Sequence, residues 1–231
     1  YLPWITLFVI TSFAVGLMLG KLLGIHHRVA FLLSSGAAIC GGTAMAAVAP
    51  IIKAKPQELL IAMTIIFLLN AVAIIVFPLV GNYLEMNNFE FGAWAALAIH
   101  DTGSVIGSAL TFSNESAEVA ATLKLGRTIW LIPLILITNW IFNKQAQATK
   151  FPRFILFFIL AIVANTVFTF NEQIINILQI SSQTFLLIGL FCIGSQFDPN
   201  ELNSISGKPL LLALMLWALV IPSAYFLVKY F

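Results

Sequence analysis

Long apolar stretches without a charged residue follow one another along most of the chain. Six of them are 18 to 26 residues long. They cover residues 3–20, 29–52, 59–84, 154–171, 173–197 and 209–228. A membrane-spanning helix needs about 20 mostly apolar residues, whereas a barrel strand needs only about 10 residues of alternating character. The pattern therefore predicts an all-α polytopic membrane protein.

Charged and turn residues divide the chain into eight predicted transmembrane segments. They cover residues 3–20, 29–52, 57–81, 91–113, 117–143, 153–171, 182–197 and 208–230. No linker or low-complexity tract separates them, so we expect a single transmembrane domain over residues 1–231. Composition agrees, because 61% of the residues are hydrophobic, 9% are charged and the mean hydropathy is +1.02. Soluble domains carry about 25% charged residues.

Two of these segments, 29–52 and 91–113, contain glycine and polar residues near their centres. These residues are Gly41, Gly42 and Thr43 in the first segment, and His100, Asp101, Thr102, Gly103 and Ser104 in the second. Each glycine lowers helix propensity by about 1 kcal/mol. Unwound backbone at membrane depth is tolerated only inside protein or beside a water-filled cavity. We therefore predict two interrupted helices, with close packing through small residues as the alternative.

The two interrupted segments also resemble a weak internal repeat. Each is followed by acidic residues and by an apolar segment with a late proline, Pro78 or Pro133. If both segments turn back as re-entrant hairpins, they enter from opposite faces as an inverted repeat. One side of the membrane then holds the basic residues 21, 28, 53, 55, 144, 150, 153 and 208, which agrees with the positive-inside rule. If they instead cross fully as broken helices, Lys53 and Lys55 move to the opposite face.

The polar residues suit a small anion. Lys124 and Arg127 are three residues apart and share one helix face, and arginine offers forked donors that fit oxyanions. The new N-terminus of a broken helix carries about half a positive charge and free N–H groups. We expect a substrate-binding site formed by Gly41, Gly42, Thr43, Thr102, Gly103, Ser104, Lys124 and Arg127. For the two cations, the alternatives are snorkelling to lipid headgroups or pairing with Asp101.

Asp101 and His100 have a structural and a coupling interpretation. Asp101 could cap the helix that starts near Thr102, and either side chain could couple protons, because ionisable groups inside membranes are usually functional. Cys40 and Cys192 lack CxxC or metal spacing, so we expect buried, inert thiols. We expect no metal and no cofactor, and no nucleotide-binding motif is visible.

Four stretches carry a resemblance to a known family. "AICGGTAMAAVAPIIKAKPQE", "FGAWAALAIHDTGSVIGSA" and "ATLKLGRTIWLIPL" resemble the YeiH-type family of bacterial inner-membrane proteins, which are designated sulfate exporters. The C-terminal stretch "FCIGSQFDPNEL…GKPLLLAL" resembles the closing segment of that family. That family usually has serine where Thr43 stands and threonine where Gly126 stands. The resemblance covers nearly the whole chain, but family members usually begin with further N-terminal helices that this sequence does not contain. It implies a location in the bacterial inner membrane and export of an anion.

The leading hypothesis is therefore a secondary transporter of a small anion such as sulfate or sulfite, held between the two interrupted helices. The alternative is a cation/proton antiporter or a sodium-coupled carrier that uses Asp101. An intramembrane enzyme with a Ser104–His100 pair is the weakest hypothesis, and we expect no enzymatic activity. The expected partners are the anion, the lipid bilayer and a coupling proton or sodium ion. The sequence leaves a homo-oligomer open and indicates no nucleic-acid partner.

Overall fold

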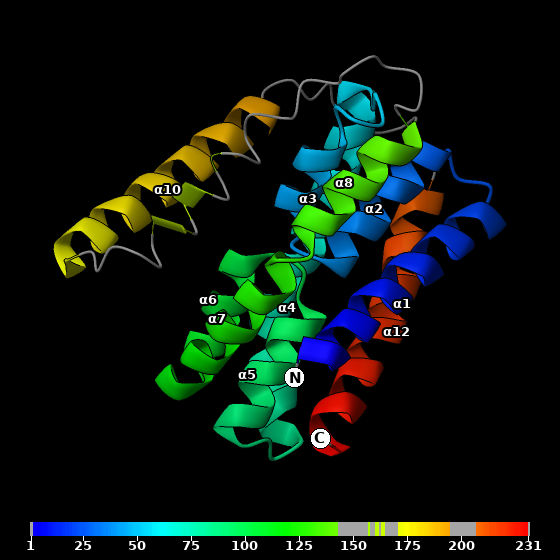
Figure 1. Cartoon of the computed structure of the whole chain (residues 1–231). Helices are drawn as coiled ribbons and strands as arrows, with labels where there is room; N and C mark the ends of the chain where they lie inside the picture. Colours follow the sequence, from blue (N-terminus) through cyan, green and yellow to red (C-terminus); the bar gives the residue numbers. More distant parts are fainter. Residues whose placement is uncertain are drawn as a thin grey trace. The chain divides into compact units, whose positions relative to one another are not determined.

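The structure, a computed structural model, describes residues 2–142, 171–194 and 207–230, together with residues 157, 160, 161, 163 and 164. These described residues form helices and turns and contain no strand (Figure 1). The chain divides into two compact units, one formed by Tyr1–Phe142 with Ile205–Phe231 and the other by Asn143–Ser204. Most of the predicted segment 153–171 and the end of the segment 182–197 lie outside the described residues. The division does not test the prediction of a single transmembrane domain.

Four stretches of the described residues are long and apolar enough to cross a membrane. They contain α1 (Leu2–Leu22), α4 (Pro56–Tyr83), the pair α7 and α8 within Asn114–Phe142, and α12 (Lys208–Tyr230). The prediction of an all-α polytopic membrane protein is therefore confirmed. In the second unit, α10 (Glu172–Gly194) begins ten residues before the predicted start at residue 182.

The predicted segment 117–143 is two helices in the structure, α7 (Asn114–Thr128) and α8 (Leu131–Phe142). The helix is interrupted at Ile129 and Trp130, shortly before Pro133. A proline ring clashes with the carbonyl four residues earlier and provides no N–H for the helix. The proline therefore favours an interruption here, although Pro78 lies inside the continuous helix α4.

The first segment with central glycines consists of α2 (His27–Ala38) and the short α3 (Gly42–Val48), with Ile39, Cys40 and Gly41 between them. After α3 the chain returns to the end of the unit at which α2 begins. The evidence is that the Arg28 guanidinium and the Glu58 carboxylate lie 3.8 Å apart. Glu58 lies in the first turn of α4. A segment that crossed the bilayer would separate these two side chains by the hydrocarbon thickness of about 30 Å.

The second such segment consists of α5 (Asn88–Ala98) and α6 (Thr102–Phe112). It also returns to its starting end. The Asn88 side chain donates to the Glu115 carboxylate at 2.6 Å, and the Ser116 hydroxyl donates to the Asn88 carbonyl at 2.8 Å. The start of α5 therefore lies against the start of α7, with α5 and α6 between them in the sequence.

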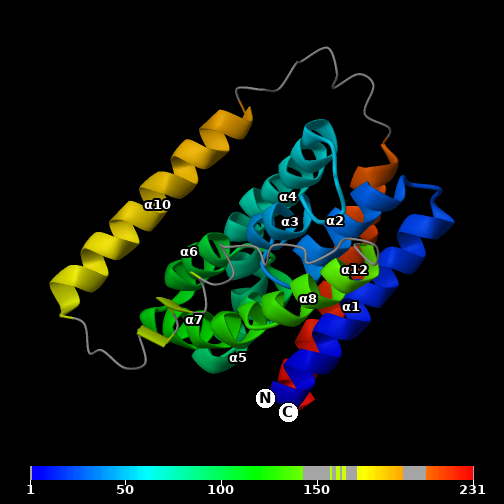
Figure 2. The same cartoon turned by 45° about the horizontal axis from the view of Figure 1, so that its top comes forward.

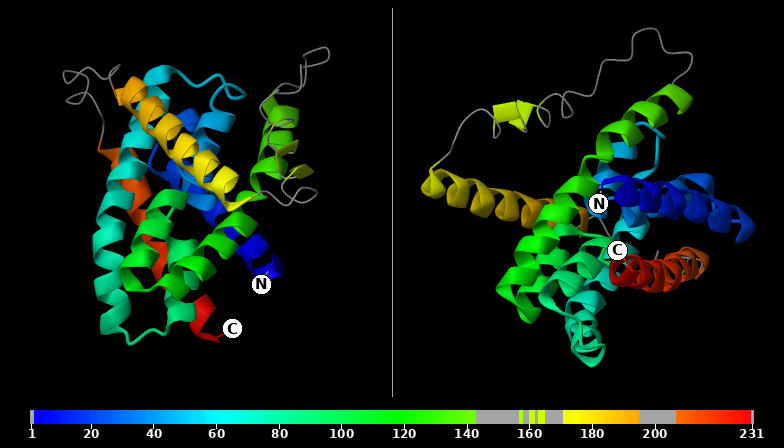
Figure 3. Two further views of the ribbon diagram at one scale, coloured as in Figure 1. Left: turned by 90° about the vertical axis from the view of Figure 1, so that its left-hand side faces the viewer. Right: turned by 60° about the horizontal axis from the view of Figure 1, so that its bottom comes forward.

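The two hairpins enter the first unit from opposite ends. Helix α4 connects them, and its 28 residues span about 42 Å at 1.5 Å per residue. In Figure 1, α2 and α3 lie in the upper half of this unit and α5 and α6 in the lower half, and Figure 2 shows the same arrangement from another direction. Helices α1 and α12 pack side by side, as the right-hand view of Figure 3 shows. Placement of the hairpins in a bilayer stays a prediction.

Charge differs between the two ends of this unit. Basic residues Lys21, Arg28, Lys53 and Lys55 flank the end where the first hairpin begins and returns. Acidic residues Glu85, Glu90, Glu115 and Glu118 flank the opposite end. This distribution is the one that the hairpin alternative requires under the positive-inside rule.

Candidate functional site

The tips of the two hairpins touch each other at Gly41 and Asp101. A Cβ atom added to Gly41 would lie 3.3 Å from the backbone N and Cα of Asp101. Gly41 also has a φ of +60° and a ψ of −126°, a conformation that side chains with a Cβ rarely adopt. Glycine is therefore required here for two reasons, the backbone conformation and the close approach of the other hairpin.

Arg127, on α7, joins the two hairpins where α2 and α5 end. Its Nε donates to the Ala38 carbonyl at 2.8 Å, and its Nη2 donates to the Ala37 carbonyl. Its Nη1 donates to Leu97 at 2.7 Å and to Ala96 at 3.2 Å. The last carbonyls of a helix lack partners within the helix and carry partial negative charge. One buried guanidinium therefore satisfies the C-terminal ends of both helices.

Two further side chains complete the end of α5. The Lys124 ammonium donates to the Ile99 carbonyl at 2.8 Å, and the Trp217 indole of α12 donates to the Ala98 carbonyl at 3.3 Å. Lys124 and Arg127 lie on one face of α7, as their spacing predicts. This face of α7 and the middle of α12 thus hold the unwound carbonyls of the second hairpin.

Snorkelling of the two cations to lipid headgroups is wrong, because Lys124 and Arg127 are both fully buried. The ion pairs found among the described residues do not include one between either cation and Asp101. The Arg127 guanidinium instead lies 5.7 Å from the centre of the Phe8 ring, within cation–π range. Direct contact of either cation with a substrate stays a prediction.

The capping role predicted for Asp101 is confirmed. Its Oδ2 accepts from the Ser104 backbone N–H at 3.1 Å and from the Ser104 hydroxyl at 3.2 Å, at the start of α6. Asp101 is only partly buried. A coupling role for its carboxylate stays a prediction.

The small residues predicted to bind substrate differ in exposure. Gly41 and Gly42 are buried, Thr102 and Ser104 are partly buried, and Thr43 and Gly103 are exposed. Gly42 packs against the Phe67 ring, which would lie 2.8 Å from an added Cβ. At the tips, Thr43 and Gly103 are therefore exposed, whereas Lys124 and Arg127 are fully buried.

His100 and Asn70 form a buried polar pair beside the second break. The His100 backbone N–H donates to Asn70 Oδ1 at 3.2 Å. The Asn70 Nδ2 and both His100 ring nitrogens have no hydrogen-bond partner among the described residues, although the ring lies near the Ala37 carbonyl. Leaving a buried donor unsatisfied costs about 1–3 kcal/mol. A purely structural role for this pair would therefore come at a cost in the stability of the folded protein.

Sequence reasoning missed Asn70 and Trp217. Asn70 gives a visible signal, since it is a strongly polar residue in the middle of the charge-free stretch 59–84. Trp217 gives none, because a tryptophan in an apolar helix is as typical of packing as of hydrogen bonding. Only the fold brings it to the end of α5.

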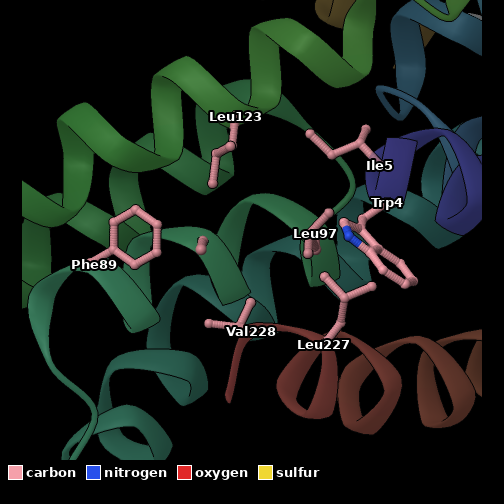
Figure 4. A pocket seen from close by; sticks show the side chains of 8 residues that line it. Trp4, Ile5, Phe89, Leu97, Leu123, Leu227 and Val228 are labelled. Carbon is pink, nitrogen blue, oxygen red and sulfur yellow. The ribbon is translucent and has the colours of Figure 1, made fainter. Parts of the chain in front are cut away.

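A separate apolar pocket lies between α1, α5, α7 and α12. It is lined by Trp4, Ile5, Phe89, Ala93, Leu97, Leu123, Leu227 and Val228. Figure 4 shows the Trp4, Leu97 and Leu227 side chains pointing toward the same space. Its side chains offer almost no hydrogen-bond donor, so it does not suit a small oxyanion. The polar hairpin tips remain the candidate site.

No group of three metal-ligating side chains lies close together in the part of the chain that the structure describes. Cys40 is buried and has a free thiol, as expected. The Cys192 side chain lies outside the described residues.

The fold and the paired helix breaks define a multi-pass α-helical membrane protein. Residues 3–213 match the family described as Conserved hypothetical protein 698, and the chain belongs to this family. The resemblance seen in the sequence is thereby confirmed, as is the multi-pass membrane location. No solved structure matches the chain.

The relatives are bacterial proteins named UPF0324 membrane protein. The one from Bacteroides thetaiotaomicron is 40% identical over 215 residues, which cover 92% of this chain and 65% of the relative. The one from Photobacterium profundum is 39% identical over 205 residues, covering 89% of this chain and 63% of the relative. The one from Porphyromonas gingivalis is 39% identical over 222 residues, which cover 93% of this chain and 67% of the relative. The chain thus spans about two thirds of the length of these relatives.

Proposed function

We propose that this protein is a secondary transporter that exports a small inorganic or sulfonate-like anion, such as sulfate or sulfite, without an enzymatic step. The observation that carries the proposal is the pair of fully buried basic side chains where the hairpins meet. Lys124 and Arg127 are fully buried there, and Asp101 is the facing carboxylate. The two C-terminal and two N-terminal helix ends carry opposite partial charges that cancel in pairs. In their ordinary charge states, two cations and one carboxylate leave one net positive charge.

A net buried charge is costly without a partner. A bound anion would provide one. The cations are fully buried and are held by main-chain carbonyls, so in this scheme they attract the anion through their field. Gly41, Gly42, Thr43, Thr102, Gly103 and Ser104 provide the neutral donors at the tips, where Thr43 is exposed.

Inverted repeats with interrupted helices at the bilayer midplane are typical of secondary transporters. The two hairpins enter from opposite ends and meet at Gly41 and Asp101, which fits this architecture. In the proposed cycle, the paired tips rock against the surrounding helices and open to one face at a time. Coupling to a proton or a sodium ion belongs to the same proposal.

The test is flux into proteoliposomes that contain the full-length protein. Wild-type protein should carry sulfate or sulfite. Thr43→Val, which removes only the tip hydroxyl, should lower this flux several-fold. The matched control is Thr111→Val, because Thr111 is exposed and its hydroxyl bonds back to the Gly107 carbonyl at 2.9 Å. Unchanged flux in Thr43→Val would remove this residue from the site.

The alternative, a cation/proton antiporter or a sodium-coupled carrier, gives a different result in the same vesicles. Asp101→Asn keeps a side-chain oxygen to cap α6 and removes the charge. The anion proposal expects this variant to keep its selectivity among anions, and a loss of coupling alone is compatible with it. Sodium-dependent flux that Asp101→Asn abolishes, with no selectivity among anions, would replace the anion proposal with the alternative.

A further inference from the structure

Asn70 is a buried polar residue in the middle of a long apolar helix. It lies in α4 and is 2% exposed. Polar groups inside a membrane segment are rare and usually have a functional partner. The hairpin tips come from α2, α3, α5 and α6, so Asn70 belongs to a helix outside both interrupted segments.

Asn70 and Lys124 hold opposite sides of one peptide group. Asn70 Oδ1 accepts from the His100 N–H at 3.2 Å, and Lys124 Nζ donates to the Ile99 carbonyl at 2.8 Å. These N–H and C=O groups belong to the same peptide unit, and in a trans peptide they point in opposite directions. No cis peptide is present among the described residues. Asn70 and Lys124 therefore reach the break from opposite sides.

The Oδ1 bond accounts for only half of the Asn70 amide. Its Nδ2 carries two N–H donors that have no partner among the described residues. The His100 ring lies near the Ala37 carbonyl, which can accept its single N–H. His100 is 1% exposed. To hold the break between α5 and α6, Asn70 needs only the hydrogen bond that its Oδ1 accepts from the His100 N–H. The Nδ2 donors are therefore not needed for this role.

The chemistry of these free groups is that of a donor site. Nδ2 can only donate. The charged groups that act on His100 are the cations Arg127 and Lys124. A negatively charged ligand that only accepts hydrogen bonds would bind these N–H donors and be attracted by the two cations. A metal cation would accept no hydrogen bond and would be repelled.

We infer that Asn70 is a substrate-contact residue, which donates through Nδ2 to an oxygen atom of a small tetrahedral or pyramidal oxyanion. This inference rests on the proposed function and extends its site to α4. Asn70 has two tasks: its Oδ1 holds the break open, and its Nδ2 binds the oxyanion.

Asn70→Asp separates the two tasks. Aspartate has nearly the same shape, so one carboxylate oxygen can still accept from the His100 N–H, while the other replaces the donors with an acceptor. The matched control is Asn82→Asp, the same substitution at an exposed position of the same helix. The readouts are sulfate-dependent thermal stabilisation of the purified full-length protein, with sodium chloride at equal ionic strength as reference, and the KM and maximal rate of sulfate flux.

Asn70→Asp should bind sulfate about tenfold more weakly or worse, with KM raised in proportion, because it loses hydrogen bonds to a charged ligand. Asn82→Asp should match the wild type. An unchanged affinity in Asn70→Asp overturns the inference. A lower maximal rate with unchanged affinity also overturns it, because Asn70 then only positions the break. If wild-type protein itself neither binds nor carries an oxyanion, the proposed function fails and this inference fails with it.

Asn70→Ser decides the matter if the aspartate variant does not fold, since serine also removes the amide donors and adds no charge. It should show the same loss of affinity. Wild-type protein labelled with 15N only at asparagine gives a measurement that needs no variant. Sulfate should shift one slowly exchanging side-chain amide pair, and an unchanged set of side-chain amides overturns the inference.

Discussion

Gly41 and Asp101 lie far apart in the sequence, yet their backbones pack directly against each other at the tips of two hairpins. Each tip is the point at which a helix stops and the chain turns back. The contact therefore brings two breaks, with their unpaired backbone groups, to one place. Arg127 and Lys124 satisfy the carbonyl side of this junction, and Asp101 accepts from the Ser104 backbone N–H at the start of α6.

Gly41→Ala should destabilise the protein. The positive φ is strained for alanine, and a methyl group 3.3 Å from the Asp101 backbone requires that backbone to shift by a few tenths of an ångström. Strained positions of this kind cost about 1–3 kcal/mol. Thermal melting in detergent measures the effect. Gly107→Ala is the control, because nothing lies within 4 Å of an added Cβ at this helical position. The control should be neutral or stabilising by up to about 1 kcal/mol. Equal melting of Gly41→Ala and wild type would contradict the contact.

Arg127→Gln should destabilise much more than a surface arginine substitution. It leaves carbonyls of Ala37, Ala38, Ala96 and Leu97 without their charged donor. Hydrogen bonds to charged groups contribute about 1.5–3 kcal/mol each, so a loss of at least about 3 kcal/mol is expected.

Arg28→Gln is the matched control, since Arg28 makes a partly exposed ion pair with Glu58 at 3.8 Å. Such pairs contribute about 0–1 kcal/mol. Chemical denaturation followed by tryptophan fluorescence compares the two variants. Similar midpoints would contradict the role of Arg127 at the helix ends.

The hairpin arrangement predicts from which face of the membrane a single introduced cysteine can be labelled. Cysteines introduced at Arg28 and Lys55 should react with an impermeant thiol reagent from the same face. A cysteine at Glu85 should react from the opposite face. These labels are measured in sealed vesicles of known orientation. The arrangement is wrong if the Lys55 position reacts only from the face opposite the Arg28 position.

Glu90 should make stability depend on pH at the acidic end of the first unit. The hydrogen bond from the Asn87 backbone N–H, together with one from Lys229, holds the Glu90 pKa below its ordinary value of 4.5. Because the folded-state pKa is the lower one, this stabilisation is present above pH 4.5 and is lost as the pH falls further.

Glu90→Gln should therefore flatten the fall of the melting temperature on acidification. Glu118→Gln, at an exposed position of α7, should leave the pH profile unchanged. Parallel profiles for Glu90→Gln and wild type would contradict the role of this carboxylate.

The helices themselves could be predicted from the sequence. Apolar stretches of 18 to 26 residues without charge have few alternatives to membrane helices, because a bilayer requires every backbone group to be satisfied within the segment. The two helix interruptions could also be located from the sequence, because Gly41, Gly42 and the polar run that begins at His100 disfavour a continuous helix. The predicted start of α10 is too late, because it excludes the polar positions within residues 172–181 from the segment, although the charge-free stretch 173–197 includes most of them.

The sequence alone determined where the chain could break and that Lys124 and Arg127 share one helix face. Only the tertiary structure decided what Lys124 and Arg127 hold. The carbonyls that they bind belong to Ile99 and to the ends of α2 and α5, and these come within reach only when the hairpins meet. Asn70 joins the same junction from α4. Hydrogen bonds act over about 3 Å, so their partners depend on how distant segments pack, which local sequence patterns do not specify.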